Sequence, residues 1–145
     1  MGTAVKLALA LVVIGVALAY ARWPRINDVE TGRTPQYPGL RVREYAAGED
    51  AVARAARAAI AALPRWEVVG WGSGPGGTEI QAVAATRLLR FKDDVTVRIH
   101  RKGGRTQVSV RSRSRIGRAD FGQNARNIQA FLDQLDRALV RNVSE

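Results

Sequence analysis

RSRSRIGRADFGQNARN, residues 111–127, joins a predicted strand to a predicted helix and decides how the rest of the chain is arranged. Three arginines in it recur with period two: Arg111, Arg113 and Arg115. Successive side chains of a strand point to opposite faces, so these guanidinium groups share one face. Ser112 and Ser114 continue the other face, which Val108 and Val110 begin. The stretch therefore predicts a last strand that is basic on one face.

The same stretch opens the last predicted helix. Asp120 precedes Gln123 by three residues, which is an Asp version of the capping box. We expect the helix to run from about Phe121 to Arg141. Its apolar stripe consists of Ile128, Phe131, Leu132, Leu135 and Leu139. Asn124 and Asn127 extend this stripe toward the helix start, where buried amides should be hydrogen-bonded.

The preceding segments predict one more helix and three more strands. Gly48 precedes a helix that Pro64 ends, with Glu49 and Asp50 at its positive end. Strands are predicted at residues 66–71, 80–91, 95–99 and 108–110, with turns at residues 73–77 and 103–104. This order predicts an α+β domain, a two-layer sandwich in which two helices cover one face of a four-stranded antiparallel sheet.

We divide the chain into three parts: residues 1–22 as a transmembrane anchor, 23–47 as an extended leader and 48–145 as the α+β domain. The leader is placed by its proline and glycine content and its lack of a sustained period. It is expected to lie over the domain as a connector.

Composition excludes several kinds of site. The chain has 145 residues, no cysteine and one histidine, His100, which excludes thiolate nucleophiles, cysteine-type zinc sites and histidine-rich metal clusters. We predict no metal, no cofactor and no enzymatic activity. The formal net charge of +10, from 23 Lys plus Arg against 13 Asp plus Glu, favours an anionic partner.

The first residues form an apolar run about the length of one membrane crossing. Lys6 lies near enough to the end to snorkel, and Tyr20 and Trp23 bracket the far end as interfacial aromatics do. A cleaved signal peptide is the alternative, with residues 17–19 as the cleavage signature. We expect a retained, single-pass anchor in a bacterial inner membrane. The arginines after it favour a cytoplasmic domain by the positive-inside rule, and a periplasmic domain stays open.

Five short motifs recur along the domain at a specific combined spacing: Asn27–Val29, Leu63–Trp66, Phe91–Val95, Arg111–Arg115 and Asp120–Ala125. With these motifs the domain resembles the domain of unknown function 1499 family. The resemblance covers roughly Arg25 to Arg141. It implies a small domain often found behind a signal or membrane segment, and it implies no established activity, cofactor or catalytic residue.

The strand-to-helix corner supplies the candidate site. Six residues are candidates for binding an anion or a partner: Arg111, Arg113, Arg115, Arg118, Asn124 and Asn127. Four are candidates for structural ion pairs or capping: Asp93, Asp94, Asp120 and Gln123. The carboxylates either pair with the arginines and hold the corner together, or leave three arginines free to grip a phosphate or carboxylate group. Acid–base catalysis by the Asp93–Asp94 pair is disfavoured, because adjacent strand residues point to opposite faces.

Arg98, His100 and Lys102 form a second basic row on the neighbouring strand. Together the rows could meet acidic headgroups or an acidic protein. Nucleic acid is disfavoured, because a sheet that binds single strands has exposed aromatics among its basic residues and neither row has any.

Two functions follow from these features. The first is a non-enzymatic accessory subunit that stabilises a larger integral membrane complex, respiratory or photosynthetic. The alternative is an exported or membrane-surface domain that binds a small anionic ligand or a lipid headgroup at the corner of Arg113, Arg115 and Asn124.

Overall fold

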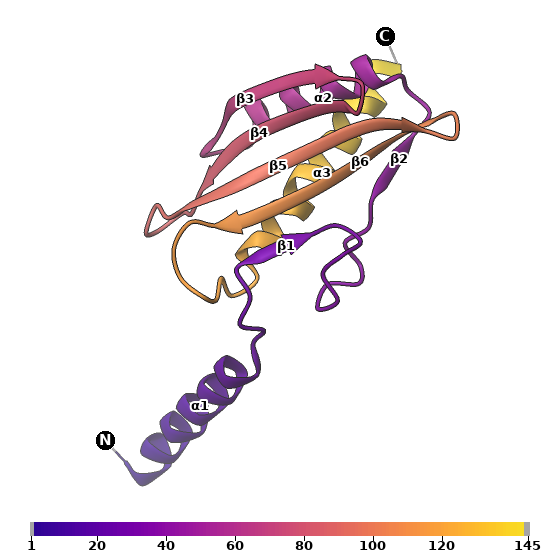
Figure 1. Cartoon of the computed structure of the whole chain (residues 1–145). Helices are drawn as coiled ribbons and strands as arrows, with labels where there is room; N and C mark the ends of the chain where they lie inside the picture. The colour runs from indigo at the N-terminus through magenta and orange to yellow at the C-terminus, as the bar shows by residue number, and fades with distance from the viewer. Residues whose placement is uncertain (1, 144–145) are drawn as a thin grey trace.

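The computed structural model describes residues 2–143 of the chain. It contains three helices and six strands in one α+β domain with an apolar helix before it (Figure 1). The elements are α1 (Thr3–Arg22), β1 (Asp28–Glu30), β2 (Arg43–Tyr45), α2 (Glu49–Ala62), β3 (Trp66–Gly74), β4 (Gly77–Ala85), β5 (Lys92–Lys102), β6 (Arg105–Ser114) and α3 (Gln123–Val143).

The sheet is antiparallel with the strand order β1-β6-β5-β4-β3, and β2 also pairs with β6. The prediction of four strands is therefore wrong, because the leader contributes two short strands. Asp28 lies opposite Arg113, and Tyr45 lies opposite Thr106, so β1 and β2 cover the two ends of one edge of β6. Three-residue strands are too short to show a period, yet they satisfy backbone groups that an open edge would leave unpaired.

The predicted strand at residues 80–91 is also too long. β4 ends at Ala85, and residues 86–91 form a loop that two hydrogen bonds close. The Thr86 N–H donates to the carbonyl of Phe91 at 2.8 Å, and the Phe91 N–H donates to Thr86 Oγ1 at 2.9 Å. Leu88 does not continue the alternation but is 89% exposed at the tip. The turn at Gly103 and Gly104 lies where it was predicted.

Both α2 and α3 pack on one face of the sheet, which is the predicted two-layer arrangement (Figure 1). α2 contributes small side chains: Ala53, Ala55, Ala56 and Ala59 are all buried. α3 contributes larger ones, and the ring of its Phe131 stacks on Trp66 of β3 at 6.4 Å between centroids. The alanines let α2 approach the sheet closely, whereas the larger side chains of α3 fill the rest of the core.

α1 is long and apolar enough to cross a membrane, although a signal sequence near the N-terminus has the same properties. None of its residues is buried against the domain core. Figure 1 shows a short connector, residues 23–27, leading from α1 to β1 at the end of the sheet where β5 begins and β6 ends. Whatever surrounds α1 is therefore close to this end of the domain.

The leader strands should contribute measurably to stability. Val29 of β1 is fully buried, so Val29→Ala should lower the free energy of unfolding by about 2 kcal/mol through lost apolar burial and a residual cavity. The matched control is Val69→Ala, because Val69 is exposed on β3 and its truncation should change little. Denaturant titration of the full chain in detergent micelles compares them. Equal effects would show that the leader is not part of the folded core.

Candidate functional site

A cluster of polar side chains lies where β5 begins, β6 ends and α3 begins. Asp93, Ser112, Asn124 and Asn127 are its buried members and Ser114 is half-buried, and all of them lie on the face that the helices cover. Asp93 is 2% exposed and Asn124 is fully buried. Buried polar groups are costly unless hydrogen-bonded, so their partners define what this corner can do.

Asn124 connects three parts of the chain. Its Oδ1 accepts from Ser112 Oγ at 2.6 Å, and its Nδ2 donates to Ser114 Oγ at 2.8 Å and to the carbonyl of Asn27 at 3.1 Å. Its backbone N–H donates to Asp120 Oδ2 at 2.7 Å. Both N–H donors of this amide are therefore used within the fold, and the side chain is fully buried, so its role is structural.

Asn127 connects α3 to the start of β5. Its Nδ2 donates to Asp93 Oδ2 at 2.8 Å and to Ser112 Oγ at 3.2 Å. Its Oδ1 accepts from Gln123 Nε2 at 2.9 Å. The prediction of a reciprocal capping box is therefore wrong. The Gln123 side chain donates to Asn127, and the Asp120 N–H donates to the carbonyl of Ile26 and not to Gln123.

Asp120 still caps the first turn of α3. Its Oδ1 accepts from the Gly122 N–H at 2.9 Å, in addition to the bond from the Asn124 N–H. These backbone donors lie at the positive end of the helix, where a carboxylate is favoured. Asp120 is thus both a helix cap and, as described below, part of a pocket wall.

Asp93 is a buried carboxyl group beside amides and hydroxyls. Burial raises its pKa, and the charges of Asp120 and Asp94 raise it further, whereas hydrogen bonds from Asn127 and Ser114 oppose the increase. Within residues 2–143 it forms no ion pair with an arginine or a lysine. Asp93 is therefore the one titratable side chain among the five members of this cluster, and its pKa is raised chiefly by burial.

A pocket of about 650 Å³ opens over this cluster. Four polar residues line its base: Asp93, Ser114, Asp120 and Gln123. Five apolar residues line its mouth, and all are exposed to solvent: Leu88, Leu89, Phe91, Ile116 and Phe121. The mouth consists of two loops, residues 86–91 and 115–122, and the base is the buried cluster. An apolar mouth over a base rich in hydrogen-bond acceptors suits an amphipathic molecule.

The predicted arginine site is divided by the sheet. Arg111, Arg113 and Arg115 point to the open face, whereas Asn124 and Asn127 lie on the helix-covered face. The expectation that the arginines and the amides lie together at one corner is therefore wrong. The alternation that places the arginines on one face of β6 also directs them away from α3. Asp93 and Asp94 likewise lie on opposite faces.

Two of these arginines are already paired. Arg111 forms a bidentate pair with Asp28 of β1, and Arg115 donates twice to Asp94 Oδ1, at 3.0 and 2.7 Å. The hydrogen bond from Arg111 lowers the pKa of Asp28 despite partial burial. Arg113 and Arg118 are exposed, and no ion pair joins either of them to another residue between positions 2 and 143.

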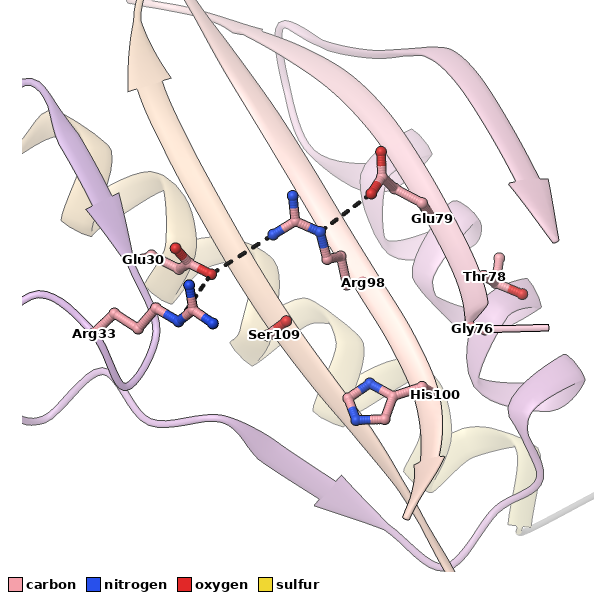
Figure 2. A pocket seen from close by; sticks show the side chains of 9 residues that line it. Glu30, Arg33, Gly76, Thr78, Glu79, Arg98, His100 and Ser109 are labelled. Atoms are coloured by element: carbon pink, nitrogen blue, oxygen red, sulfur yellow. Dashed lines mark hydrogen bonds and ion pairs between the residues drawn. The ribbon is translucent and has the colours of Figure 1, made fainter. Parts of the chain in front are cut away.

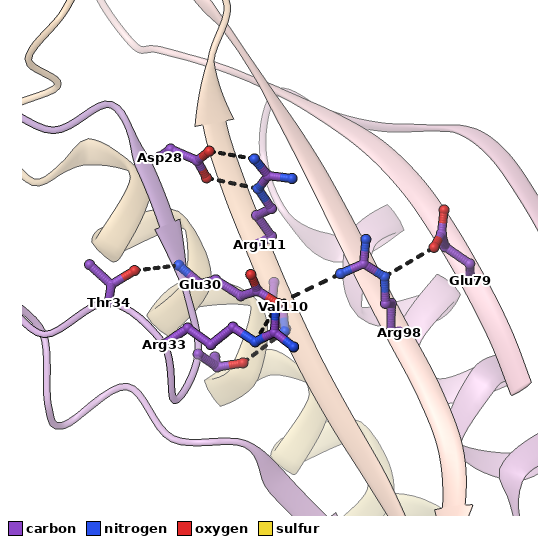
Figure 3. A network of polar contacts seen from close by, with 9 residues as sticks. Asp28, Glu30, Arg33, Thr34, Glu79, Arg98, Val110 and Arg111 are labelled. Atoms are coloured by element: carbon purple, nitrogen blue, oxygen red, sulfur yellow. Dashed lines mark hydrogen bonds and ion pairs between the residues drawn. The ribbon is translucent and has the colours of Figure 1, made fainter. Parts of the chain in front are cut away.

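The rest of the open face carries a further ion-pair network. Figure 3 shows Arg98 between Glu30, at 3.6 Å, and Glu79, at 3.1 Å, with Arg33 also pairing with Glu30. A pocket of about 420 Å³ lies there, and His100 is one of its lining residues (Figure 2). Because the charges around it already neutralise one another, this face is less suited to an anion than the sequence predicts.

The apolar mouth of the corner pocket was missed by the sequence analysis. The signal was present in residues 86–91, Thr-Arg-Leu-Leu-Arg-Phe, where two leucines are adjacent. Adjacent apolar residues cannot both point to the core from a half-buried strand. One of them must be exposed, and here both are.

Comparisons with known proteins identify the domain but not its activity. A family model described as "Protein of unknown function (DUF1499)" matches residues 20–135. No curated protein matches the chain. The solution structure of Chr148 from Cytophaga hutchinsonii is similar at 14% identity and a TM-score of 0.39, over 84% of this chain and 96% of that one.

The protonation state of Asp93 can be determined from the pH dependence of the free energy of unfolding. Its pKa is raised above the ordinary value of 3.8, so in the window between the two values the folded chain binds more protons than the unfolded chain. Stability attributable to Asp93 therefore falls as the pH rises through that window. Asp93→Asn removes this loss, so the variant should gain stability relative to the wild type as the pH rises.

Asp28→Asn is the matched control, because the pKa of Asp28 is lowered and the sign reverses. Its ion pair stabilises the fold above the ordinary pKa and is lost as the pH falls through the lower, folded value. Relative to the wild type, this variant should lose stability as the pH rises. Denaturation of the full chain over an acidic pH series measures both, and parallel curves for the two variants would contradict the assignment.

Proposed function

The chain belongs to the DUF1499 family of unknown function, and we propose that it is a single-pass membrane protein whose domain binds a lipid-like molecule in the corner pocket. The observation that carries the proposal is the composition of that pocket, with five exposed apolar side chains at its mouth and four polar ones at its base. Exposed apolar groups of this size gain stability when a hydrocarbon covers them.

The pocket has the size and the polarity of a ligand site. Its volume of about 650 Å³ lies within the range of roughly 300–1,000 Å³ that is usual for small-molecule pockets. The leucines and phenylalanines of the mouth would contact an acyl chain. The amide and hydroxyl groups of the base are rigidly placed by the hydrogen bonds of Asn124 and Asn127.

The base also indicates the chemistry of the head that would enter it. Asp93 and Asp120 present carboxylate oxygens, so the base favours hydroxyl or ammonium donors over a bare anion. Arg126 lies at the rim and could meet a phosphate attached to such a head. A phospholipid head that carries a hydroxyl or an amine combines both features.

The accessory-subunit role stays a prediction from the sequence. The apolar mouth could also contact a partner in a larger complex. A flat protein surface, however, would not reach the polar base of the pocket. Acid–base catalysis by Asp93 and Asp94 likewise stays without a supporting observation, since the two carboxyl groups lie on opposite faces of the sheet.

Ligand binding can be tested in detergent, where no bilayer is present. A photoreactive diacyl phospholipid should label the wild-type chain saturably, and unlabelled phospholipid should compete. Ala119 lines the pocket and Ala61 is exposed on α2, so Ala119→Trp should abolish saturable labelling while Ala61→Trp should not. Competitors with ethanolamine, glycerol or no head substituent then rank the donors. Labelling that persists in Ala119→Trp would exclude the pocket.

The anchor is tested on the full chain in cells. If α1 is a membrane span, the chain should stay in the membrane fraction after alkaline carbonate extraction, and its intact mass should include residues 1–22. Removal of α1 by a signal peptidase would instead release a soluble chain that begins near Tyr20. That result would contradict the membrane part of the proposal and leave the pocket to be tested as a soluble site.

A further inference from the structure

The surface around the pocket mouth differs from the rest of the domain. Among the side chains whose burial the structure describes, eight large hydrophobic ones are exposed outside α1 and the connector at residues 23–27: Val69, Trp71, Leu88, Leu89, Phe91, Ile116, Phe121 and Val140. Five of these lie in the loops 86–91 and 115–122. Of the others, Trp71 has its ring covered by the guanidinium of Arg57 at 4.4 Å. Exposed apolar residues are therefore concentrated at one end of the domain.

This end of the domain is attached to the end of α1. The rings of Tyr20 and Phe121 are 5.0 Å apart between centroids. A Cβ on Gly122 would lie 3.1 Å from Trp23, so the backbone of the loop approaches the Trp23 ring closely. The aromatic residues at the end of the anchor are thus in direct contact with the pocket mouth.

The connector between α1 and the domain is hydrogen-bonded to the same corner. The carbonyl of Ile26 accepts from the Asp120 N–H at 3.1 Å, and the carbonyl of Asn27 accepts from the Ser114 N–H at 2.8 Å. Few residues remain between Arg22 and these bonds. The two loops are therefore held next to the point where α1 ends and cannot swing to the far side of the domain.

The loops also carry cations without acidic partners. Arg87 and Arg90 flank the leucines of one loop, and Arg118 lies between the apolar residues of the other. In the part of the chain that the structure describes, none of the three forms an ion pair. Alternation of apolar and arginine side chains is typical of segments that lie in the headgroup region of an anionic membrane.

We infer that the loops 86–91 and 115–122 lie in the lipid headgroup layer beside the exit of α1, so that the pocket opens toward the bilayer. The inference rests on the membrane anchor of the proposed function and adds the surface that contacts lipid. A phospholipid could then place its head on the polar base while its acyl chains remain among the leucines and the surrounding lipid. The turn between β5 and β6, at Gly103 and Gly104, lies at the end of the sheet far from α1 (Figure 1).

The absence of cysteine from the chain makes this arrangement directly measurable. Leu88→Cys and Ile116→Cys each place a single label on one loop, and Lys102→Cys places it at the far end of β5 as a matched exposed control. The full chain is labelled with an environment-sensitive fluorophore and reconstituted into vesicles of equal parts phosphatidylcholine and phosphatidylglycerol. Quenching by aqueous iodide is compared with quenching by a nitroxide on the lipid head.

Labels at Leu88 and Ile116 should be protected from iodide several-fold relative to the label at Lys102 and should be quenched by the nitroxide lipid. Replacing phosphatidylglycerol by phosphatidylcholine should weaken this protection, because the arginines then lose their anionic partners. Equal iodide quenching at all three positions would overturn the inference. Protection in native membranes that disappears in pure lipid would also overturn it, and would assign the loops to a protein partner.

Failure here is distinguishable from failure of the proposed function. A chain that resists carbonate extraction but leaves both loop labels open to iodide keeps its anchor and loses only the bilayer contact. A chain released by carbonate loses the membrane premise itself. Saturable lipid labelling in detergent is independent of both, because it needs the pocket and no bilayer.

Discussion

The hydrogen bonds of the Asn124 amide are the interaction on which the corner depends. This amide is fully buried, and it joins the end of β6, the connector before β1 and the start of α3. An apolar residue there would leave hydroxyls and a carbonyl without partners, each at a cost of about 1–3 kcal/mol. The pocket base is rigid because it is made of side chains that Asn124 and Asn127 already hold in place.

The alternation of β5 and β6 separates two electrostatic environments across one sheet. On the open face, Asp28 and Asp94 are neutralised by Arg111 and Arg115, and both carboxylates are partly exposed to solvent. On the covered face, Asp93 has amides and hydroxyls as its neighbours, so its charge is stabilised less. Adjacent carboxyl groups in the sequence thus have different roles because one faces a helix and the other faces solvent.

The sequence predicts the elements whose apolar pattern is sustained over many residues. It fails to predict elements that are too short to show a pattern or in which the pattern is interrupted. α2, α3 and the hairpin at Gly103 follow from spacing, glycine and apolar stripes. β1 and β2 have three residues each, so only pairing with β6 reveals them. The basic row and the amides were each predicted, but their relative placement requires knowing which face α3 covers. The pocket mouth was missed because residues 86–91 continue an apparent strand whose backbone in fact turns.

The backbone of the pocket mouth supports a role other than stability. Arg90 and Phe121 have φ angles of 56° and 51°, and a residue other than glycine in this region costs roughly 1–2 kcal/mol. Arg65, with φ of 63°, closes the turn before β3 and donates to the carbonyl of Ala85, so its conformation serves the fold. Arg90 and Phe121 instead lie in the two loops of the pocket mouth, where both side chains are exposed and the Phe121 ring contacts Tyr20. Strain that presents apolar and cationic groups to the surroundings is accounted for if those surroundings bind them, and the lipid surface that we infer at the end of α1 would do so.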